Sequence, residues 1–202
     1  MIQILTPAAS QLLSTLEAVR AEVGAADLSD DAAGTLLAQA SSALGRHCRR
    51  SFGRVTLLET VYPDRDWEVV LSALPIGAVV EVTADGVPLP PERWELDPGA
   101  GVLQRLDPDG CMRRWCTRRL VVQYTAGWLL PGQEGRDLPA EVERACLLTI
   151  AAWHAARGRD PLMRSESYEG IGSTSWLDPR EGSEALPPQA AGLLAEYRLG
   201  RS

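Results

Sequence analysis

Residues 79–87 have the sequence Val-Val-Glu-Val-Thr-Ala-Asp-Gly-Val and lie within a zone, residues 55–124, whose periodicity differs from that of the residues before it. β-Branched residues dominate the stretch, which is typical of strands. Asp85-Gly86 lies between β-forming residues, and this dipeptide tolerates the positive φ angles that a tight hairpin turn needs. The stretch therefore predicts a β-hairpin.

Similar short runs of β-forming residues occur on both sides of this hairpin. They predict about six short strands, which are placed at residues 55–62, 67–71, 79–83, 94–96, 102–106 and 120–124. Pro88, Pro90 and Pro91 indicate loop or edge positions, because proline cannot donate a hydrogen bond to a central ladder. We predict a β-rich insert over residues 55–124.

The residues before this insert have the period of helices. Apolar residues recur at helical spacing over residues 12–19. A second helix is expected from Ser29, whose side chain can cap the first turn, and the acids after it suit the positive end of the helix dipole. Its apolar stripe covers residues 33–48, and Gly53 is a natural stop. Residues 1–54 are therefore predicted to be the first part of a helical core.

The residues after the insert return to helical periodicity. Val142, Cys146 and Ile150 are spaced to lie on one helix face. The stripe is wide, which implies burial between other elements. Pro139 suits the start of this helix. We predict that residues 125–158 are the second part of the helical core.

The C-terminal part combines a long loop with a short helix. Residues 159–185 hold Gly, Ser, Pro and charged residues without a sustained period, which predicts a flexible loop. In residues 186–202, one helix face is expected to carry Ala190, Leu193, Leu194 and Tyr197. The predicted fold class is α+β: a helical bundle core, an inserted β-rich subdomain, and a C-terminal extended arm that ends in a short helix.

The charge balance argues against a DNA-wrapping protein. All 20 basic residues are Arg, and 27 acids give a net charge of -7. A monomeric DNA-binding domain is usually basic, because neutralisation of phosphates dominates its affinity. No stretch reaches the ~18 apolar residues that a membrane span needs, and the N-terminus does not resemble a signal peptide.

Local basic clusters remain within this acidic chain. They consist of Arg46, Arg49, Arg50 and Arg54, and of Arg113, Arg114, Arg118 and Arg119. One interpretation is contact with nucleic acid or with an acidic neighbouring surface. The other is a solvated face whose arginines form salt bridges with some of the acids. In an oligomer, the acidic stretch 1–31, with five acids against one Arg, could meet one of these clusters on a neighbour.

The sequence offers no recognisable catalytic or metal site. The two histidines, His47 and His154, are each placed on a helix, without a nucleophile at a suitable spacing. No H-E-x-x-H, C-x-x-C, G-x-x-x-x-G-K or G-x-S-x-G motif occurs. The four cysteines are expected to be reduced structural thiols. We therefore predict neither catalytic residues nor a cofactor.

Five sequence patches and a tail segment follow one another in a characteristic order. They are residues 30–54, 74–86, 94–103, 121–128 and 138–153, followed by 186–198. The fourth patch has the sequence Val-Val-Gln-Tyr-Thr-Ala-Gly-Trp. Their order and spacing resemble the head–tail connector (adaptor, or head-completion) family of long-tailed double-stranded DNA phages and phage-like particles. The first 28 residues match only loosely, and the loop 159–185 is longer than expected.

This resemblance implies a structural protein. Members of the family typically form a ring of about twelve copies under the portal, which prolongs the DNA channel and carries the stopper or tail. The implied partners are other copies of the chain, the portal protein and a stopper or tail-completion protein. DNA would pass through the lumen without sequence-specific binding. The implied location is the host cytoplasm during assembly and then the virion.

The resemblance also implies where the chain meets the portal. The C-terminal segment would carry the docking residues Leu186, Leu193, Leu194, Tyr197 and Arg198. The two arginine clusters would contact neighbouring subunits or the DNA channel. The alternatives are another head–tail joining protein, such as a stopper or tail-end subunit, and a small cysteine-dependent hydrolase.

Overall fold

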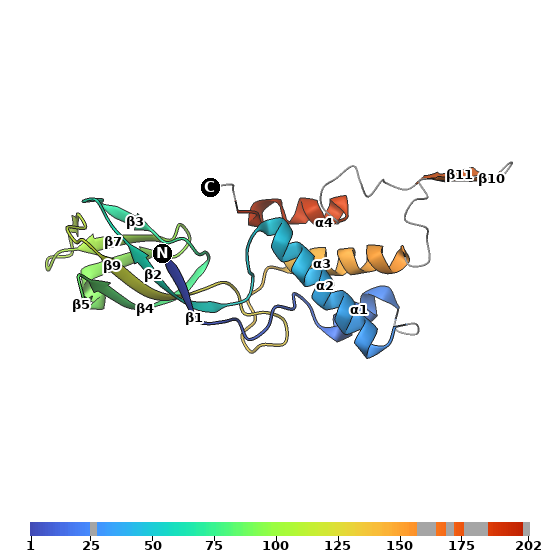
Figure 1. Ribbon diagram of the computed structural model, residues 1–202, viewed down its shortest axis with the longest axis horizontal. Coiled ribbons are helices and arrows are strands. Elements are labelled where there is room, and N and C mark those ends of the chain that lie inside the picture. The colour runs from blue at the N-terminus through green and yellow to red at the C-terminus, as the bar shows by residue number, and fades with distance from the viewer. Residues whose placement is uncertain (25–27, 157–164, 169–171, 176–185, 200–202) are drawn as a thin grey trace. The chain divides into compact units, whose positions relative to one another are not determined.

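The computed structural model describes residues 1–24, 28–156, 165–168, 172–175 and 186–199 (Figure 1). The chain divides into two compact units. The sheet unit comprises Met1–Gln11 and Ser51–Asp137, and the helical unit comprises Leu12–Arg50 and Leu138–Ser202. Each unit is therefore built from segments that are distant in the sequence.

The sheet unit contains two antiparallel sheets. The five-stranded sheet has the order β1 (Ile2–Thr6), β2 (Val55–Val61), β9 (Leu120–Ala126), β4 (Ile76–Ala84), β5 (Val87–Leu89). The other sheet has the order β3 (Glu68–Val70), β7 (Val102–Leu106), β6 (Trp94–Asp97), and β8 (Met112–Arg113) pairs with β7. A short 3-10 helix, Pro91–Arg93, precedes β6.

One hydrophobic core joins the two sheets. In β9, Leu120, Val122 and Tyr124 are buried, with half-buried residues between them. This period of two is expected for a strand with one face in a core. Val69 and Leu103 of the other sheet belong to the same buried cluster. The sheet unit is thus held together mainly by burial of apolar side chains between its sheets.

The predicted hairpin is present. Asp85 and Gly86 connect β4 to β5 and have φ angles of 50° and 86°. Two consecutive residues with positive φ make the tight turn that matches the twist of the flanking strands. The other predicted strands are also found, with β4 and β9 extending further than the sequence indicated.

The N-terminal residues differ from the prediction. Residues 1–54 were expected to be helical, but Ile2–Thr6 form strand β1, and Ile4 pairs with Leu57 of β2. This segment is too short to show a helical or strand period of its own, so its pairing with β2 decides its conformation. Pairing with a neighbouring strand satisfies backbone groups that an isolated strand would leave to water.

The helical unit contains α1 (Leu16–Val23), α2 (Asp30–Cys48), α3 (Ala140–Ala155) and α4 (Pro188–Leu193), and a 3-10 turn, Ala195–Tyr197. The side chain of Ser29 accepts a hydrogen bond from the backbone N–H of Ala32, so α2 begins where the sequence predicted. Its C-terminus differs: the helix ends at Cys48, and Arg49 takes the left-handed conformation with φ 55°.

Gly53, the predicted helix stop, has a different role in the sheet unit. It forms a parallel bridge with Trp128. A Cβ atom at this position would lie 2.7 Å from both the Ala8 Cβ and the Ser10 carbonyl oxygen. Glycine is therefore needed here for close approach of backbones.

The predicted loop at 159–185 contains regular structure in the part that is described. Ser165–Tyr168 and Gly172–Ser175 form strands β10 and β11, which pair antiparallel with each other. The remaining residues of this range lie outside the described residues. Among the helices that the described residues form, none combines the length and apolar character required to cross a membrane.

Candidate functional site

The C-terminal helix, predicted to dock on another protein, packs on α3 of its own chain. Ala190 and Leu194 are both 0% exposed. The Tyr197 hydroxyl donates a hydrogen bond to Glu141 Oε2 of α3 at 2.5 Å. This bond is the main cause that raises the pKa of Tyr197 to about 12. The apolar face that needed a partner finds one within the helical unit.

The next residues are held at the end of α2. The Leu199 N–H donates to the carbonyl oxygen of Cys48 at 3.0 Å. This carbonyl lies in the last turn of α2, where no intrahelical donor is available. The C-terminal segment therefore satisfies part of the α2 terminus.

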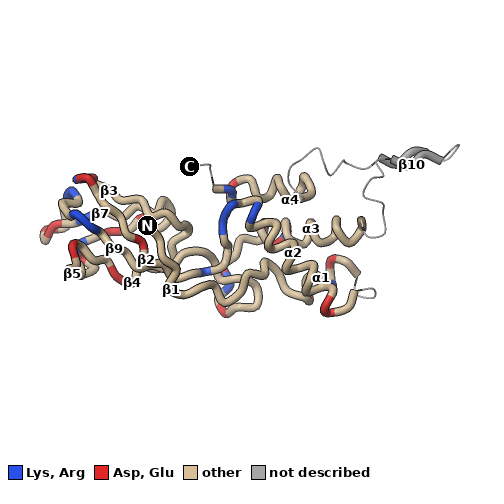
Figure 2. Tube along the Cα trace, in the orientation of Figure 1, with Lys and Arg blue, Asp and Glu red and all other residues tan. Residues whose placement is uncertain are grey.

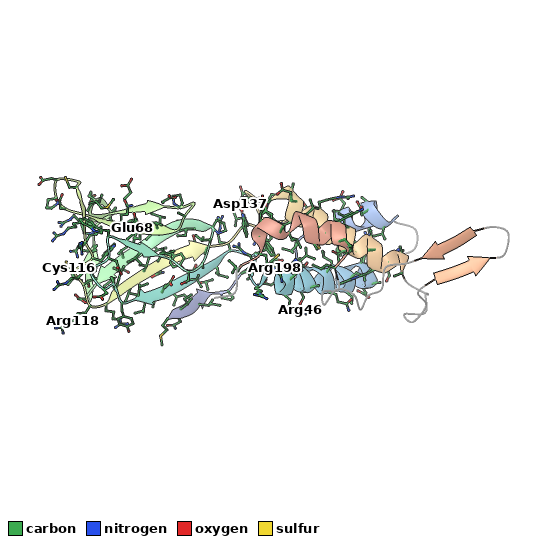
Figure 3. The ribbon with its side chains drawn as sticks, turned by 90° about the horizontal axis from the view of Figure 1, so that it is seen from above. Arg46, Glu68, Cys116, Arg118, Asp137 and Arg198 are labelled. Carbon is green, nitrogen blue, oxygen red and sulfur yellow. The ribbon has the colours of Figure 1, made fainter. Side chains whose placement is uncertain are left out.

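The predicted docking residues fall into two groups. Leu194 is fully buried, so its side chain stabilises the helical unit and is not on the surface. Leu186, Leu193 and Tyr197 are half-buried, and Arg198 is exposed. Arg198 is also labelled in Figure 3. The half-buried and exposed residues leave a surface that a partner could contact.

An open groove lies on the helical unit beside α2. It has a volume of about 470 Å³ and is lined by Ala38, Gln39, Ser42, Arg46 and Trp153. Arg46 Nη1 donates a hydrogen bond to Ser42 Oγ at 3.2 Å. The groove combines an apolar lining from Ala38 and Trp153 with polar groups from Gln39, Ser42 and Arg46.

The first arginine cluster is divided between the two units. Arg46, Arg49 and Arg50 belong to the helical unit, whereas Arg54 belongs to the sheet unit. Arg46 and Arg49 are at least partly exposed, and burial lowers the pKa of the half-buried Arg50 guanidinium.

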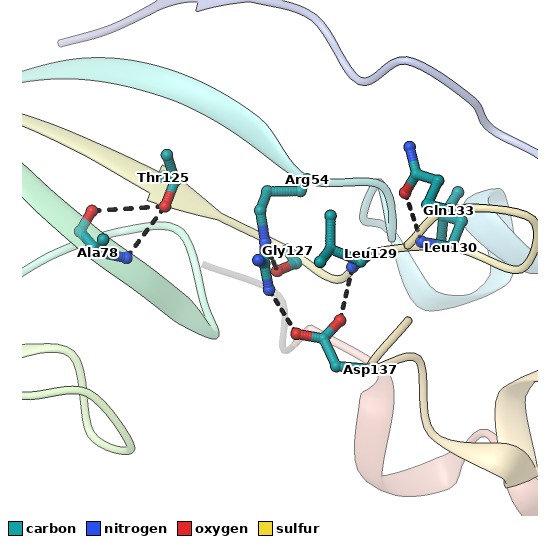
Figure 4. Close-up of polar contacts among 8 residues, drawn as sticks. All are labelled: Arg54, Ala78, Thr125, Gly127, Leu129, Leu130, Gln133 and Asp137. Carbon is teal, nitrogen blue, oxygen red and sulfur yellow. Dashed lines mark hydrogen bonds and ion pairs between the residues drawn. The ribbon is translucent and has the colours of Figure 1, made fainter. Parts of the chain in front are cut away.

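Arg54 has a structural role (Figure 4). Its guanidinium Nη2 forms an ion pair with Asp137, and its Nε donates to the Gly127 carbonyl oxygen at 3.2 Å. The other oxygen of Asp137 accepts the Leu129 N–H at 2.5 Å. Arg54 and Asp137 therefore link three backbone segments of the sheet unit. These contacts occupy most of the Arg54 guanidinium, so it has few donors left for a partner protein.

The second arginine cluster lies at one end of the sheet unit. Arg113, Arg114, Arg118 and Arg119 all have exposed side chains. Figure 3 shows Arg118 at the end of this unit that is distant from Asp137. The Arg114 guanidinium lies 5.1 Å from the ring centroid of Trp67, which is within the range of a cation–π contact.

Asp85 of the hairpin turn organises this end of the unit. Its carboxylate accepts backbone N–H bonds from Arg118 and Arg119 at 3.0 and 2.8 Å. A hydrogen bond from the Thr117 side chain, followed by these backbone bonds, lowers the pKa of Asp85. The loop that carries the predicted cluster is therefore fixed to the β4–β5 hairpin.

Two further arginines join this cluster that the sequence did not single out. Arg105 of β7 pairs directly with Arg113 of β8. Arg93 precedes β6 and donates its Nε–H to the Leu106 carbonyl oxygen at 3.2 Å. Arg105 reaches Arg113 through the short β7–β8 connection, and the strand register, which the sequence pattern did not predict, places the two residues opposite each other.

The cysteines have the surroundings of structural residues or of surface thiols. Cys48 and Cys146 are buried, and Cys111 and Cys116 are exposed. Burial is the main cause that raises the pKa of Cys146 to about 12. A nucleophilic cysteine needs a lowered pKa, so Cys146 has the opposite of the required electrostatics. In the part of the chain that the structure describes, no group of three or more His, Cys, Asp or Glu residues could hold a metal ion.

Comparisons with solved structures find a similar fold in chains of virion and neck structures of GTA particles. A chain in the structure "Neck of empty GTA particle computed with C6 symmetry" matches with a TM-score of 0.58 and 18% identity, over 100% of this chain and 97% of that chain. A chain in "Virion of native gene transfer agent (GTA) particle" matches with a TM-score of 0.56, 18% identity and the same coverages. A chain in "Neck of native GTA particle computed with C12 symmetry" matches with a TM-score of 0.53 and 15% identity, again over 100% and 97%.

These similarities establish a shared fold over the full length of the chain. No protein-family model matches the sequence, and a search of curated proteins gives no match. The α+β fold predicted from the sequence is confirmed.

Proposed function

We propose that this chain is a structural head–tail connector subunit in the neck of a phage or phage-like particle. Twelve copies would form a ring under the portal, prolong the DNA channel and present the platform for the stopper or tail. The observation that carries this proposal is the fold similarity to chains of GTA virion and neck structures, which covers both units and 97% of each matched chain. The proposed number of copies follows the C12 symmetry of one of these neck structures.

A closed ring also suits the physical character of the chain. The protein has no recognised catalytic motif and carries a net charge of -7, which favours solubility before assembly. Weak contacts between copies become strong in a ring, because each subunit is held by two neighbours and cyclic closure links them all.

The C-terminal segment is our candidate for the portal contact. Leu186, Leu193, Tyr197 and Arg198 are at least partly accessible, and Leu194 would anchor the segment to α3 from beneath. A helix of six residues is too short to be stable alone. Packing on α3 therefore prepares the segment for docking, which lowers the entropy that it loses on binding.

Electron microscopy of the purified chain, mixed with the portal protein of the same particle, tests the proposal. The expected result is a ring stacked on the portal, with an open lumen that continues the DNA channel. A matched sample that lacks residues 186–202 should lose the contact with the portal. A chain that leaves the portal bare but binds at the stopper position would assign it to another head–tail joining protein.

A further inference from the structure

Three arginines at the end of the sheet unit create an unusual concentration of positive charge. We name Arg93, Arg105 and Arg113 the arginine triplet. Arg105 lies directly opposite Arg113 across the β7–β8 ladder, and like charges in this position destabilise a sheet. The charges of Arg113 and Arg93, after burial as the largest cause, lower the pKa of Arg105. Figure 2 shows arginines in this part of the sheet unit. The fold therefore tolerates a local electrostatic cost at this point.

The geometry places Arg105 partly inside the unit. Arg105 follows the fully buried Leu103 by two residues in β7, so both side chains belong to the same sheet face. The Arg105 guanidinium lies 5.8 Å from the ring centroid of the buried Trp115. A position against an indole ring restricts the guanidinium and keeps it from being fully hydrated.

Two hydrogen-bond donors at this position are unsatisfied. Arg105 Nε and Trp94 Nε1 are buried and have no hydrogen-bond partner among the described residues. Trp94 and Arg105 are paired across the β6–β7 ladder, so the two donors come from adjacent positions. A buried donor without a partner destabilises a fold, because it has lost its hydrogen bonds to water. Because both atoms lie beneath the surface, they add to the local cost at this point, and a partner could reach only the outer part of the Arg105 guanidinium.

The unit itself supplies no carboxylate to the triplet. None of the ion pairs between described residues includes Arg93, Arg105 or Arg113. Asp85 is near enough to influence Arg105, but its oxygens already accept the backbone N–H groups of the loop that follows β8. The positive charge of the triplet is therefore left largely uncompensated.

The charge of the whole chain favours a carboxylate over a phosphate as the acceptor. With 27 acids and a net charge of -7, the chain repels a nucleic acid at long range and attracts it only locally. The same acids make other copies of the chain a source of carboxylates. In a ring, each copy presents one surface to a different surface of its neighbour.

Two carboxylates on the helical unit suit this requirement. Glu17 lies in the first turn of α1 and Asp31 in the first turn of α2, and both are exposed. We name these two residues the acidic pair. Neither carboxylate takes part in a hydrogen bond or ion pair with a described residue, whereas Asp30 pairs with Arg20 and Glu22 with Arg144. The acidic pair thus carries charge that the unit does not use.

We propose that the arginine triplet of one copy binds the acidic pair of a neighbouring copy. The guanidinium groups of Arg105 and Arg113 would receive the carboxylates. This inference rests on the proposed ring, and it assigns to the ring a charged contact between the sheet unit of one copy and the helical unit of the next. Arg-carboxylate pairs are well suited to this task because the guanidinium binds a carboxylate through two parallel hydrogen bonds.

A charge exchange between the two surfaces tests the proposal on the full chain. Sedimentation velocity at increasing protein concentration would measure self-association of wild type, of Arg105→Glu/Arg113→Glu, of Glu17→Arg/Asp31→Arg, and of a mixture of the two variants. We expect each variant alone to associate at least about tenfold more weakly, and the mixture to recover most of the wild-type association. We also expect wild-type association to weaken with added salt.

Arg65→Glu/Arg136→Glu is the matched control. It makes the same change of charge on exposed side chains of the sheet unit, outside both arginine clusters, and should alter association less than about threefold. Equal weakening by the control would overturn the proposal, as would failure of the mixture to associate. Wild type that remains monomeric at all concentrations would overturn it too.

Two further measurements distinguish misfolding and nucleic-acid binding from the proposed contact between copies. Circular dichroism and thermal unfolding report whether a variant folds, and Arg105→Gln/Arg113→Gln provides a milder change if the charge reversal does not fold. A fluorescent DNA duplex that binds wild type but not this Gln variant, with self-association unchanged, would assign the triplet to nucleic acid instead. Rings of Arg105→Glu/Arg113→Glu on the portal, indistinguishable from wild type, would refute this inference and leave the proposed function standing.

Discussion

Replacement of Gly127 by alanine probes the junction of backbone segments in the sheet unit. Gly127 has a φ of 95°, and an added Cβ would lie 2.7 Å from the Gly53 carbonyl oxygen and 2.9 Å from that of Phe52. The left-handed conformation costs a residue with a side chain about 1–2 kcal/mol. Pressing a methyl group against backbone atoms that cannot rotate away adds about 1–3 kcal/mol. We therefore expect Gly127→Ala to lower the free energy of unfolding by about 2–5 kcal/mol.

Gly110 offers a matched control for the conformational part of this effect. Its φ is 80°, but an added Cβ would meet nothing within 4 Å. Gly110→Ala should therefore lower the free energy of unfolding by only about 1–2 kcal/mol, which is the cost of the left-handed conformation alone. Urea unfolding followed by tryptophan fluorescence measures both variants. If Gly127→Ala destabilises the protein no more than Gly110→Ala, the close approach of backbones has no energetic weight and the reasoning is wrong.

Three further predictions concern buried or hydrogen-bonded side chains. Tyr124→Phe removes the hydroxyl that donates a hydrogen bond to the buried Glu59 at 2.6 Å, and we expect the free energy of unfolding to fall by about 1–3 kcal/mol. The fall should be smaller when Glu59→Gln is already present. A double-mutant cycle measured by urea unfolding checks this coupling, and equal falls in both backgrounds would contradict it. Leu194→Ala should destabilise the helical unit by about 2–5 kcal/mol, and Leu194→Met should destabilise it much less, because methionine fills most of the same volume. Thermal unfolding measures both variants. Equal losses of stability would contradict the burial of this residue. The pKa of Tyr197 is raised from 10 to about 12 by its bond to Glu141, so the stability from this bond is present below pH 10 and is lost as the pH rises toward 12. Melting temperatures of wild type should fall across this range more than those of Tyr197→Phe, and parallel curves would refute the bond.

Local signals in the sequence were enough for most elements of the fold. Ser29 before two acids predicted the start of α2, because capping needs only residues that are neighbours in the chain. Asp85-Gly86 predicted its hairpin for the same reason, since the turn depends on the φ preferences of two residues. Helix periodicity likewise predicted α3 and the short C-terminal helix.

Residues whose conformation depends on a distant partner were predicted poorly. Ile2–Thr6 became a strand only because β2 lies beside it, about fifty residues later in the sequence. Gly53 was assigned to a helix end, but it serves the contact with Ala8 and Ser10. In both cases the deciding interaction is a backbone approach that leaves no periodic pattern in the sequence.

The candidate assembly surfaces show the same division. The sequence indicated a basic cluster at Arg113 and an amphipathic C-terminal helix that needs a partner. It could not indicate that this partner includes α3, with Leu194 fully buried. It also could not indicate that Arg105 lies opposite Arg113, or that two buried donors beside them have no hydrogen-bond partner among the described residues.

The sequence by itself determined the α+β composition, the order of most helices and strands, and the residues that carry charge. These properties follow from local backbone preference and from hydrophobic period, both of which a chain expresses through near neighbours. Only the tertiary structure decided which charges face one another and which apolar faces remain open. Strand register and helix packing make these decisions, because they bring together side chains such as Tyr197 and Glu141 that the sequence separates by 56 positions.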